Sequence, residues 1–259
     1  MAAILIALSW IISTTGYALK HANFKIKRNG NDEVRIAQGL LEKKELVLKL
    51  HRIQAITIKE RILRQPFGYC AVQVEVIQSK ETNEEKEKVT LHPIIRRKKM
   101  YNSYSHIYNY RTKWKTNIIP LPKEALRRYL IMGWVTSAVL AVPIIGASIY
   151  FKQNIALFIL IPLFIIFTLL AYARYTSSGY MIRDNQLVMV YRGLAKYTGI
   201  MRRRHVQAIE NTQSYFQKKD ELCTANVSVA GHRYKVKHMQ KEDALRIYNW
   251  YKEKGNTGV

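Results

Sequence analysis

Two long charge-free stretches separated by a single lysine constrain this chain more than any other feature. They cover residues 129–151 and 153–173, and only Lys152 interrupts them. A helix of about 20 apolar residues is long enough to cross the roughly 30 Å hydrocarbon core of a bilayer. Neither stretch has the polar face that a core helix of a soluble protein turns toward water. The sequence therefore predicts a transmembrane helical hairpin over residues 129–173.

The amino-terminal segment, residues 1–19, is also free of charge, but serine and threonine dilute its second half. Two interpretations stay open: a transmembrane helix, or a signal peptide with a poor cleavage site at residues 16–18. The segment has no basic residues before its apolar run, which favours the helix. With the hairpin, this predicts three transmembrane helices, one single and two paired.

The remaining regions are strongly basic. Lys and Arg number 42 against 18 Asp and Glu, so the formal net charge is +24. Basic residues flank the outer ends of the charge-free stretches, whereas the hairpin link holds only Lys152. Because cytoplasmic flanks of transmembrane helices are enriched in Lys and Arg, we expect a multi-pass protein of the cell membrane with both polar regions in the cytoplasm.

An internal repeat relates the two polar regions. His51–Ile56 reads HRIQAI and Arg204–Ile209 reads RHVQAI; Cys70 follows Gln54 by 16 positions, and Cys223 follows Gln207 by the same 16. Alternating apolar residues around these motifs indicate antiparallel strands, and residues 240–251 have helical periodicity. Each region is therefore predicted to be a small β barrel or sandwich closed by a helix. The two cysteines are then most simply buried residues on equivalent strands.

These motifs resemble the second type of bacterial pleckstrin-homology (PH) domain, found in YdbT-like membrane proteins. The residues that carry the resemblance are Gly39-Leu40 with Arg52–Gln54, Arg192–Leu194 with His205–Gln207, and the approach to the hairpin through residues 89–93 and 121–129. The resemblance covers almost the whole chain and marks a fold, not a reaction. It implies that the chain is the carboxy-terminal part of a longer array of such units.

The expected architecture is a membrane protein of mixed α and β structure with two PH-like antiparallel barrels, each closed by a helix. The predicted domains are a transmembrane helix (1–19), a first PH-like domain with a basic and aromatic juxtamembrane segment (20–128), the hairpin (129–173) and a second PH-like domain (174–259).

Basic residues close to the membrane segments form a candidate lipid-binding set. Long cations and aromatic rings suit the headgroup layer, and each Lys or Arg near an anionic surface contributes about 1 kcal/mol. Strand alternation would let at most two residues of the run at 202–205 share one patch. A solvated basic face over core tyrosines explains the same pattern equally well. The candidate residues are Arg96, Arg97, Lys98, Lys99, Arg111, Lys113, Lys115, Arg202 and Arg204.

Catalysis and nucleic-acid binding have little support in the sequence. The hairpin stretches contain no ionisable acid or base for a proton relay, and the seven histidines show no metal-ligand spacing. There is no phosphate-binding glycine loop, nucleophile elbow, zinc finger or RNA-binding signature. We expect no enzyme activity, no cofactor, no metal site and no nucleic-acid partner.

Three hypotheses for function remain. The leading one is a non-enzymatic platform that binds anionic phospholipid and a companion membrane protein with a PH-like domain; a homo-oligomer is also compatible with the sequence. By analogy, the resemblance implies a role in membrane protection or immunity against antimicrobial peptides. The alternatives are an accessory component of a peptide export system and a lipid-acting enzyme without a recognisable motif.

Overall fold

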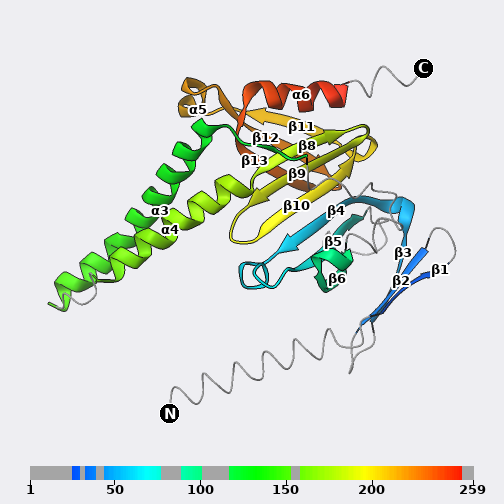
Figure 1. Cartoon of the computed structure of the whole chain (residues 1–259), viewed down its shortest axis with the longest axis horizontal. Helices are drawn as coiled ribbons and strands as arrows, with labels where there is room; N and C mark the ends of the chain where they lie inside the picture. The colour runs from blue at the N-terminus through cyan, green and yellow to red at the C-terminus, as the bar shows by residue number, and fades with distance from the viewer. Residues whose placement is uncertain are drawn as a thin grey trace, which may run out of the picture.

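A computed structural model of the chain describes residues 25–29, 33–38, 44–76, 89–100, 117–152 and 158–252. These form two similar units separated in sequence by a helical hairpin, which projects from one side of the β region (Figure 1). The first unit consists of β1 (Lys25–Asn29), β2 (Glu33–Gln38), β3 (Lys44–Lys49), η1 (Leu50–Arg52), β4 (Ile53–Glu60), η2 (Ile62–Arg64), β5 (Tyr69–Val76) and β6 (Val89–Arg96). The short strand β7 (Ile119–Pro120), α3 (Lys123–Tyr150) and α4 (Leu160–Ser177) follow.

The second unit repeats the element order of the first. It consists of β8 (Gly179–Arg183), β9 (Gln186–Arg192), β10 (Lys196–Arg202), η5 (Arg203–His205), β11 (Ala208–Thr212), α5 (Tyr215–Lys219), β12 (Leu222–Val229), β13 (His232–Gln240) and α6 (Lys241–Lys252). In both units three strands lead through a 3₁₀ turn into three more strands. Cys70 and Cys223 are buried on the equivalent strands β5 and β12, as the repeat spacing predicts.

The two units share one sheet. Its strand order is β6-β5-β4-β10-β9-β8-β7, and the units meet where β4 pairs antiparallel with β10. The outer sheets, β1-β2-β3 and β11-β12-β13, have three strands each. The expectation of two closed barrels is therefore wrong. The described strands of each unit form two sheets, and one sheet of each unit continues into the other unit.

A continuous apolar run suits β4 to a position inside the shared sheet, where both of its faces are covered. In β4 the sequence Ile53–Glu60 is buried at nearly every position, which is typical of a strand covered on both faces. We call the β4–β10 pair the seam between the two units, and the hydrophobic cores extend across it. Val188, Val190 and Ile200 of the second unit pack in the core of the first, and Ala55 of the first packs in the core of the second.

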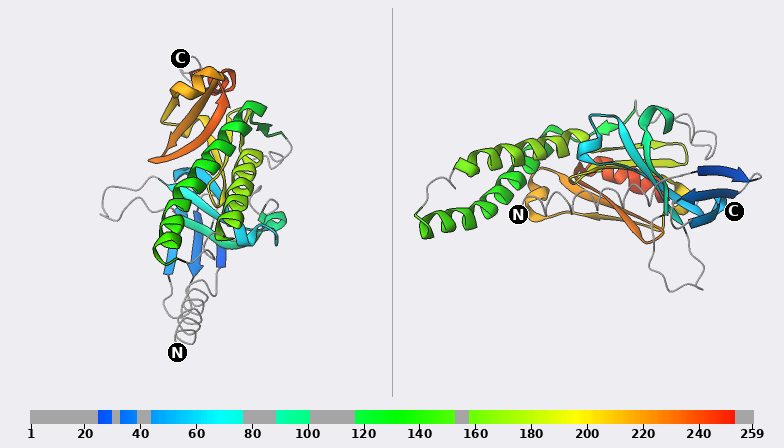
Figure 2. Two further views of the ribbon diagram at one scale, coloured as in Figure 1. Left: turned by 90° about the vertical axis from the view of Figure 1, so that its left-hand side faces the viewer. Right: turned by 90° about the horizontal axis from the view of Figure 1, so that it is seen from below.

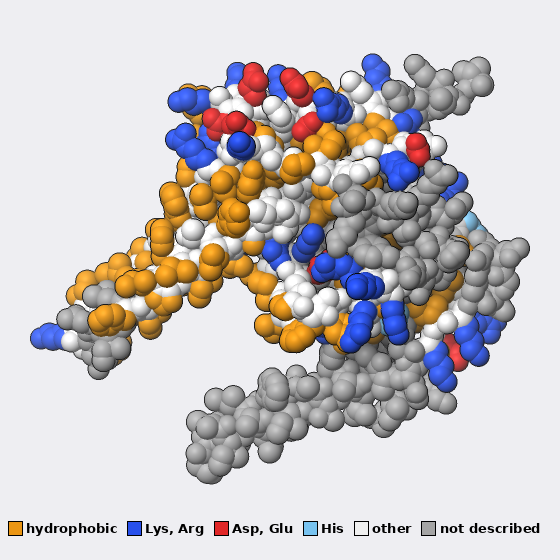
Figure 3. All heavy atoms as spheres, viewed as in Figure 1, with side chains coloured by type: hydrophobic (Ala, Val, Ile, Leu, Met, Phe, Trp, Pro, Cys, Tyr) orange, Lys and Arg blue, Asp and Glu red, His pale blue; other side chains and the backbone are white. Residues whose placement is uncertain are grey.

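The helices α3 and α4 form the predicted hairpin and are long and apolar enough to cross a membrane. Their outward surfaces are covered with hydrophobic side chains (Figure 3). Small residues allow the helices to approach closely, since a Cβ on Gly133 would lie 2.9 Å from that of Ala171. The indole of Trp134 donates a hydrogen bond to Thr168 Oγ1 at 3.2 Å. The predicted amino-terminal helix, residues 1–19, lies outside the described residues.

Candidate membrane-facing site

Two turns, one from each unit, meet at the same end of the shared sheet. In the β4–β10 pair Lys196 lies opposite Glu60, so the β4–β5 turn follows Glu60 at the end where the β9–β10 turn precedes Lys196. Both turns lie on the side of the β region from which the hairpin projects (Figure 1). The fold therefore brings residues of two distant segments to the side of the molecule from which the hairpin projects.

Large apolar side chains are exposed at these turns. Leu63 and Phe67 in the β4–β5 turn are 81% and 74% exposed, and Leu194 in the β9–β10 turn is 66% exposed. Basic side chains lie beside the hydrophobic ones on this surface (Figure 3). Apolar residues surrounded by cations at the end of a sheet are suited to the interface of an anionic bilayer, where the side chains reach below the headgroups.

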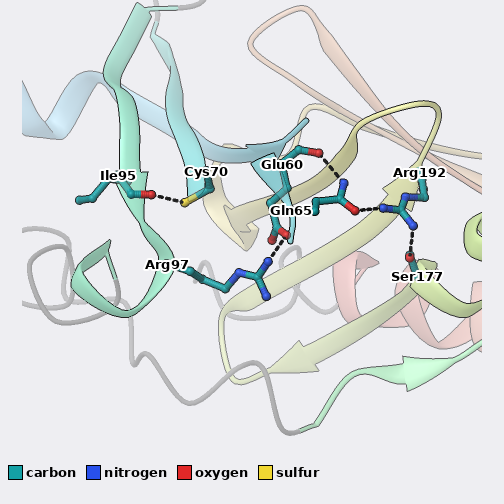
Figure 4. Close-up of polar contacts among 7 residues, drawn as sticks. All are labelled: Glu60, Gln65, Cys70, Ile95, Arg97, Ser177 and Arg192. Carbon is teal, nitrogen blue, oxygen red and sulfur yellow. Dashed lines mark hydrogen bonds and ion pairs between the residues drawn. The ribbon is translucent and has the colours of Figure 1, made fainter. Parts of the chain in front are cut away.

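A polar network beneath the turns fixes their position (Figure 4). The Gln65 side chain donates through Nε2 to the carbonyl oxygen of Glu60 at 2.7 Å, which closes the β4–β5 turn. Its Oε1 accepts a hydrogen bond from Arg192 in β9. Arg192 also donates through Nη1 to Ser177 Oγ at 3.4 Å, at the end of α4. The turn of the first unit is thereby connected to the second unit and to the hairpin.

An ion pair closes the other side of this network. Arg97 Nη2 lies 2.5 Å from Glu60 Oε2, and the Glu60 side chain is 8% exposed. The nearby Cys70 thiol donates to the carbonyl oxygen of Ile95 at 3.6 Å. Burial above all, together with the charge of Glu60, raises the pKa of Cys70 to about 12, so this thiol stays protonated and is a structural residue.

The predicted lipid-binding residues Arg96–Lys99 lie at this end of the sheet, because Arg96 pairs with Tyr69 directly after the β4–β5 turn. Arg96 donates through Nε to the Tyr69 hydroxyl at 3.2 Å and is exposed, as are Lys98 and Lys99. Arg97 differs from them, since it is half-buried in the pair with Glu60. Arg111, Lys113 and Lys115 lie outside the described residues.

Arg202 and Arg204 lie at the opposite end of the shared sheet. Arg202 ends β10, six positions along the strand from Lys196, which at 3.3 Å per residue is about 20 Å. The residues that follow form the 3₁₀ turn η5, so the expected strand alternation over this run is wrong. Arg204 donates through Nε to His205 Nε2 at 3.0 Å. The structure thus places the described members of the predicted basic set at two opposite ends of one sheet.

The comparison with known proteins agrees with this architecture. The model of the bacterial PH domain family matches residues 1–108 and 130–255 of the chain. The chain belongs to this family. It is also 32% identical over 253 residues to the UPF0699 transmembrane protein YdbT of Bacillus subtilis (strain 168). That alignment covers 94% of this chain and 49% of YdbT, so the chain spans about half the length of this curated relative.

The second PH-like unit is joined directly to the base of the hairpin. Arg128 in α3 donates through Nε to Asp220 Oδ2 at 2.7 Å, just after α5. The ring of Tyr129 contacts the His238 ring edge-on, with 5.2 Å between ring centroids. The Gln217 amide lies 3.1 Å from His238 Nδ1. Burial, with smaller contributions from Lys237 and Arg128, lowers the pKa of His238 to about 4.

Sequence reasoning missed the exposed apolar turn residues of the two PH-like units. Gln65 in the β4–β5 turn accepts the hydrogen bond from Arg192 that joins the units. The available signal was two large apolar residues between the predicted strands, Leu63 and Phe67, the first of them directly before Arg64. Among the described residues, no group of three or more His, Cys, Asp or Glu could hold a metal ion.

Proposed function

We propose that the chain is a non-catalytic membrane platform whose PH-like units bind the inner leaflet through the β4–β5 and β9–β10 turns. The observation that carries this proposal is the exposure of Leu63, Phe67 and Leu194 at the end of the shared sheet nearest the hairpin. Membership in the bacterial PH domain family and similarity to a transmembrane protein support a membrane-associated role.

The energetics favour this orientation. Moving a leucine or phenylalanine side chain from water into an apolar layer contributes about 1.5–3 kcal/mol. Each cation near an anionic surface adds about 1 kcal/mol, and Arg96, Lys98 and Lys99 are exposed at this end. Because the hairpin already holds the protein at the membrane, these interactions decide which surface of the PH-like units touches the lipid.

The charge distribution supports a cytoplasmic location for both PH-like units. Arg127, Arg128 and Arg174 lie near the ends of α3 and α4 that join the units, whereas Lys152 is the single charged residue of the hairpin link. We therefore propose that the link faces outward and that the lipid partner is the anionic phospholipid of the inner leaflet.

The test uses the full chain reconstituted in vesicles, with Phe67→Cys carrying an environment-sensitive dye. The native thiols Cys70 and Cys223 are buried and do not compete for the label. We expect a blue-shifted emission that grows with the fraction of anionic lipid. Replacing Arg96, Lys98 and Lys99 with Gln should abolish that growth, while Arg97 is left in place because it pairs with Glu60.

The matched control replaces Arg202 and Arg204 with Gln, which removes charge at the opposite end of the sheet. This control should respond to anionic lipid like the parent protein. If it loses the response while the Arg96 variant keeps it, the proposed surface is the wrong one. A spectrum that is the same in anionic vesicles, zwitterionic vesicles and detergent would also overturn the proposal.

The finer physiological role rests on the family resemblance. Protection of the membrane against antimicrobial peptides, together with a companion PH-like membrane protein, is the leading proposal, and a part in peptide export is its alternative. Deleting the protein should increase killing by membrane-active peptides if it protects, and should reduce peptide release from a producing cell if it assists export.

A further inference from the structure

The seam between the two PH-like units is formed by two particular edges. Each unit consists of two halves of three strands. In the second unit β10 is the last strand of the first half, and in the first unit β4 is the first strand of the second half. These two strands pair with each other. By element order, β3 of the first unit corresponds to β10, and β11 of the second unit corresponds to β4. Each unit therefore has one edge like that of β10 and one edge like that of β4. The β4–β10 seam joins the β4 edge of the first unit to the β10 edge of the second.

The two remaining edges have no described strand beside them. In the sheet orders β1-β2-β3 and β11-β12-β13, β3 and β11 are terminal. In β10, Ile200 is 4% exposed, whereas its counterpart Val47 in β3 is 49% exposed. Leu48, the counterpart of Met201, is already buried in the core of its own unit. A strand edge with exposed apolar side chains is a template for pairing with another strand.

The same contrast separates β4 from β11. Ala55 and Ile56 in β4 are 0% and 5% exposed. Their counterparts Ala208 and Ile209 carry the same side chains but are exposed and half-exposed. Strand β11 has thus kept the residues that β4 presents to β10, without the covering strand.

From this correspondence we infer that β3 of one copy of this chain pairs antiparallel with β11 of a second copy, in the register of the β4–β10 seam. In that seam Ile200 lies opposite Ile56 and Met201 opposite Ala55. When η1 is aligned with η5, Val47 and Leu48 take the places of Ile200 and Met201, and Ile209 and Ala208 take the places of Ile56 and Ala55. The register of the seam then places Val47 opposite Ile209 and Leu48 opposite Ala208. Both are apolar pairs, as in the existing seam.

The arrangement of the chain allows such an assembly within one membrane. The sheets that contain β3 and β11 lie at opposite ends of the β region, so one chain cannot pair its own two edges (Figures 1 and 2). The β4–β5 turn lies on the hairpin side, and its counterpart α5 is followed by Asp220, which binds Arg128 at the hairpin base. Repeating the seam therefore keeps every unit facing the same bilayer.

The consequence is a head-to-tail contact, not a two-fold symmetric one. Repeated contacts of this kind close into a ring or continue as a filament along the membrane. The relative YdbT is about twice as long as the part that this chain covers, which leaves room for more such units in one polypeptide.

The test is disulfide trapping between two differently tagged full-length chains in the same membranes. One chain carries Val47→Cys and the other Ile209→Cys, and an oxidant is added. Because facing residues of antiparallel strands lie within disulfide range, we expect roughly tenfold more mixed dimer than with a mismatched cysteine. The matched control pairs Ile209→Cys with Leu245→Cys on α6, where Leu245 is 46% exposed, close to the 49% of Val47.

A second variant tests the same contact without disulfide trapping. Val47→Lys places a charge on the apolar edge and should shift the cross-linked or native-mass distribution toward monomer, whereas Leu245→Lys should not. Equal trapping for residues 47 and 245 would overturn the inference. So would a dominant 47–47 product, or capture of Val47→Cys by a different PH-like membrane protein in place of the second copy.

Discussion

The hydroxyl of Thr57 in β4 lies 2.8 Å from the hydroxyl of Tyr234 in β13, and both residues are fully buried. They are 177 positions apart in sequence, so this contact ties the first PH-like unit to the second. The Tyr234 ring packs against Gly199 of β10, which lies opposite Thr57 in the seam. A side chain at position 199 would occupy the space of the ring.

Gly199→Ala should therefore destabilise the protein strongly. A Cβ at this position would overlap the buried Tyr234 ring, and overpacking of this kind costs about 1–3 kcal/mol. Thermal unfolding in detergent should show a lower midpoint. The control is Gly193→Ala, because a Cβ there meets nothing within 4 Å. Equal midpoints for the two variants would contradict the packing described at the seam.

Thr57 and Tyr234 should be energetically coupled across the seam. Thr57→Val and Tyr234→Phe each remove one buried hydroxyl, and each should lower the free energy of unfolding by about 1–2 kcal/mol. The double variant should lose less than the sum, with a coupling of about 0.5 kcal/mol or more. Chemical denaturation of all four proteins measures this cycle. Additive losses would mean that the two hydroxyls do not interact.

Glu60 and Arg97 should behave as a pair whose members depend on each other. Arg97→Gln leaves a buried carboxylate without its cation, which costs about 3 kcal/mol. Replacing Glu60 with Gln as well should recover part of this loss, since the carboxylate that lacks its partner is then removed. Unfolding midpoints of the single and double variants test this. A double variant less stable than Arg97→Gln would be evidence against the pair.

His238 should make the protein sensitive to mild acid. Its pKa is about 4 in the folded protein, below the ordinary value of 6.5, because burial and neighbouring cations disfavour the charged ring. The unfolded chain then binds a proton more readily, so stability is full above pH 6.5 and is lost as the pH falls toward 4. The loss is at most about 3 kcal/mol.

The matched variant is His238→Asn, because asparagine tolerates the left-handed backbone at this position, where φ is 57°. Its unfolding free energy should change less than that of the parent between pH 6.5 and 4. Parallel pH profiles for parent and variant would show that His238 is not the group responsible.

Much of the fold could be predicted from local patterns, but the seam could not. Charge-free length predicted the hairpin, and the shared spacing from Gln54 to Cys70 and from Gln207 to Cys223 predicted that the two cysteines are buried on equivalent strands. The pairing of β4 with β10 was missed because an apolar strand reads the same whether its partner lies in its own unit or in the other. Closed barrels were the simplest interpretation of such strands, and the shared sheet replaces them.

The candidate site was predicted only in part, for a related reason. Positive charge near Arg96 is visible in the sequence, but charge alone did not separate it from Arg202 and Arg204 at the other end of the sheet. A leucine in an exposed turn and a leucine in the core cannot be told apart in the sequence, because only the structure gives their exposure. Leu63 was therefore not recognised as a surface residue. Only the three-dimensional arrangement shows that Leu194, far along the chain, reaches the same surface.

The depth of Leu63 in the bilayer tests the central claim most directly. A fluorescent label on Leu63→Cys in the reconstituted full chain is compared with one on Tyr248→Cys, which is 45% exposed on α6, on the far side of the β region from the β4–β5 turn. Lipids that carry a quencher just below the headgroup should quench the label at position 63 and leave the one at 248 bright. Equal quenching at both positions, or none at 63, would contradict the account.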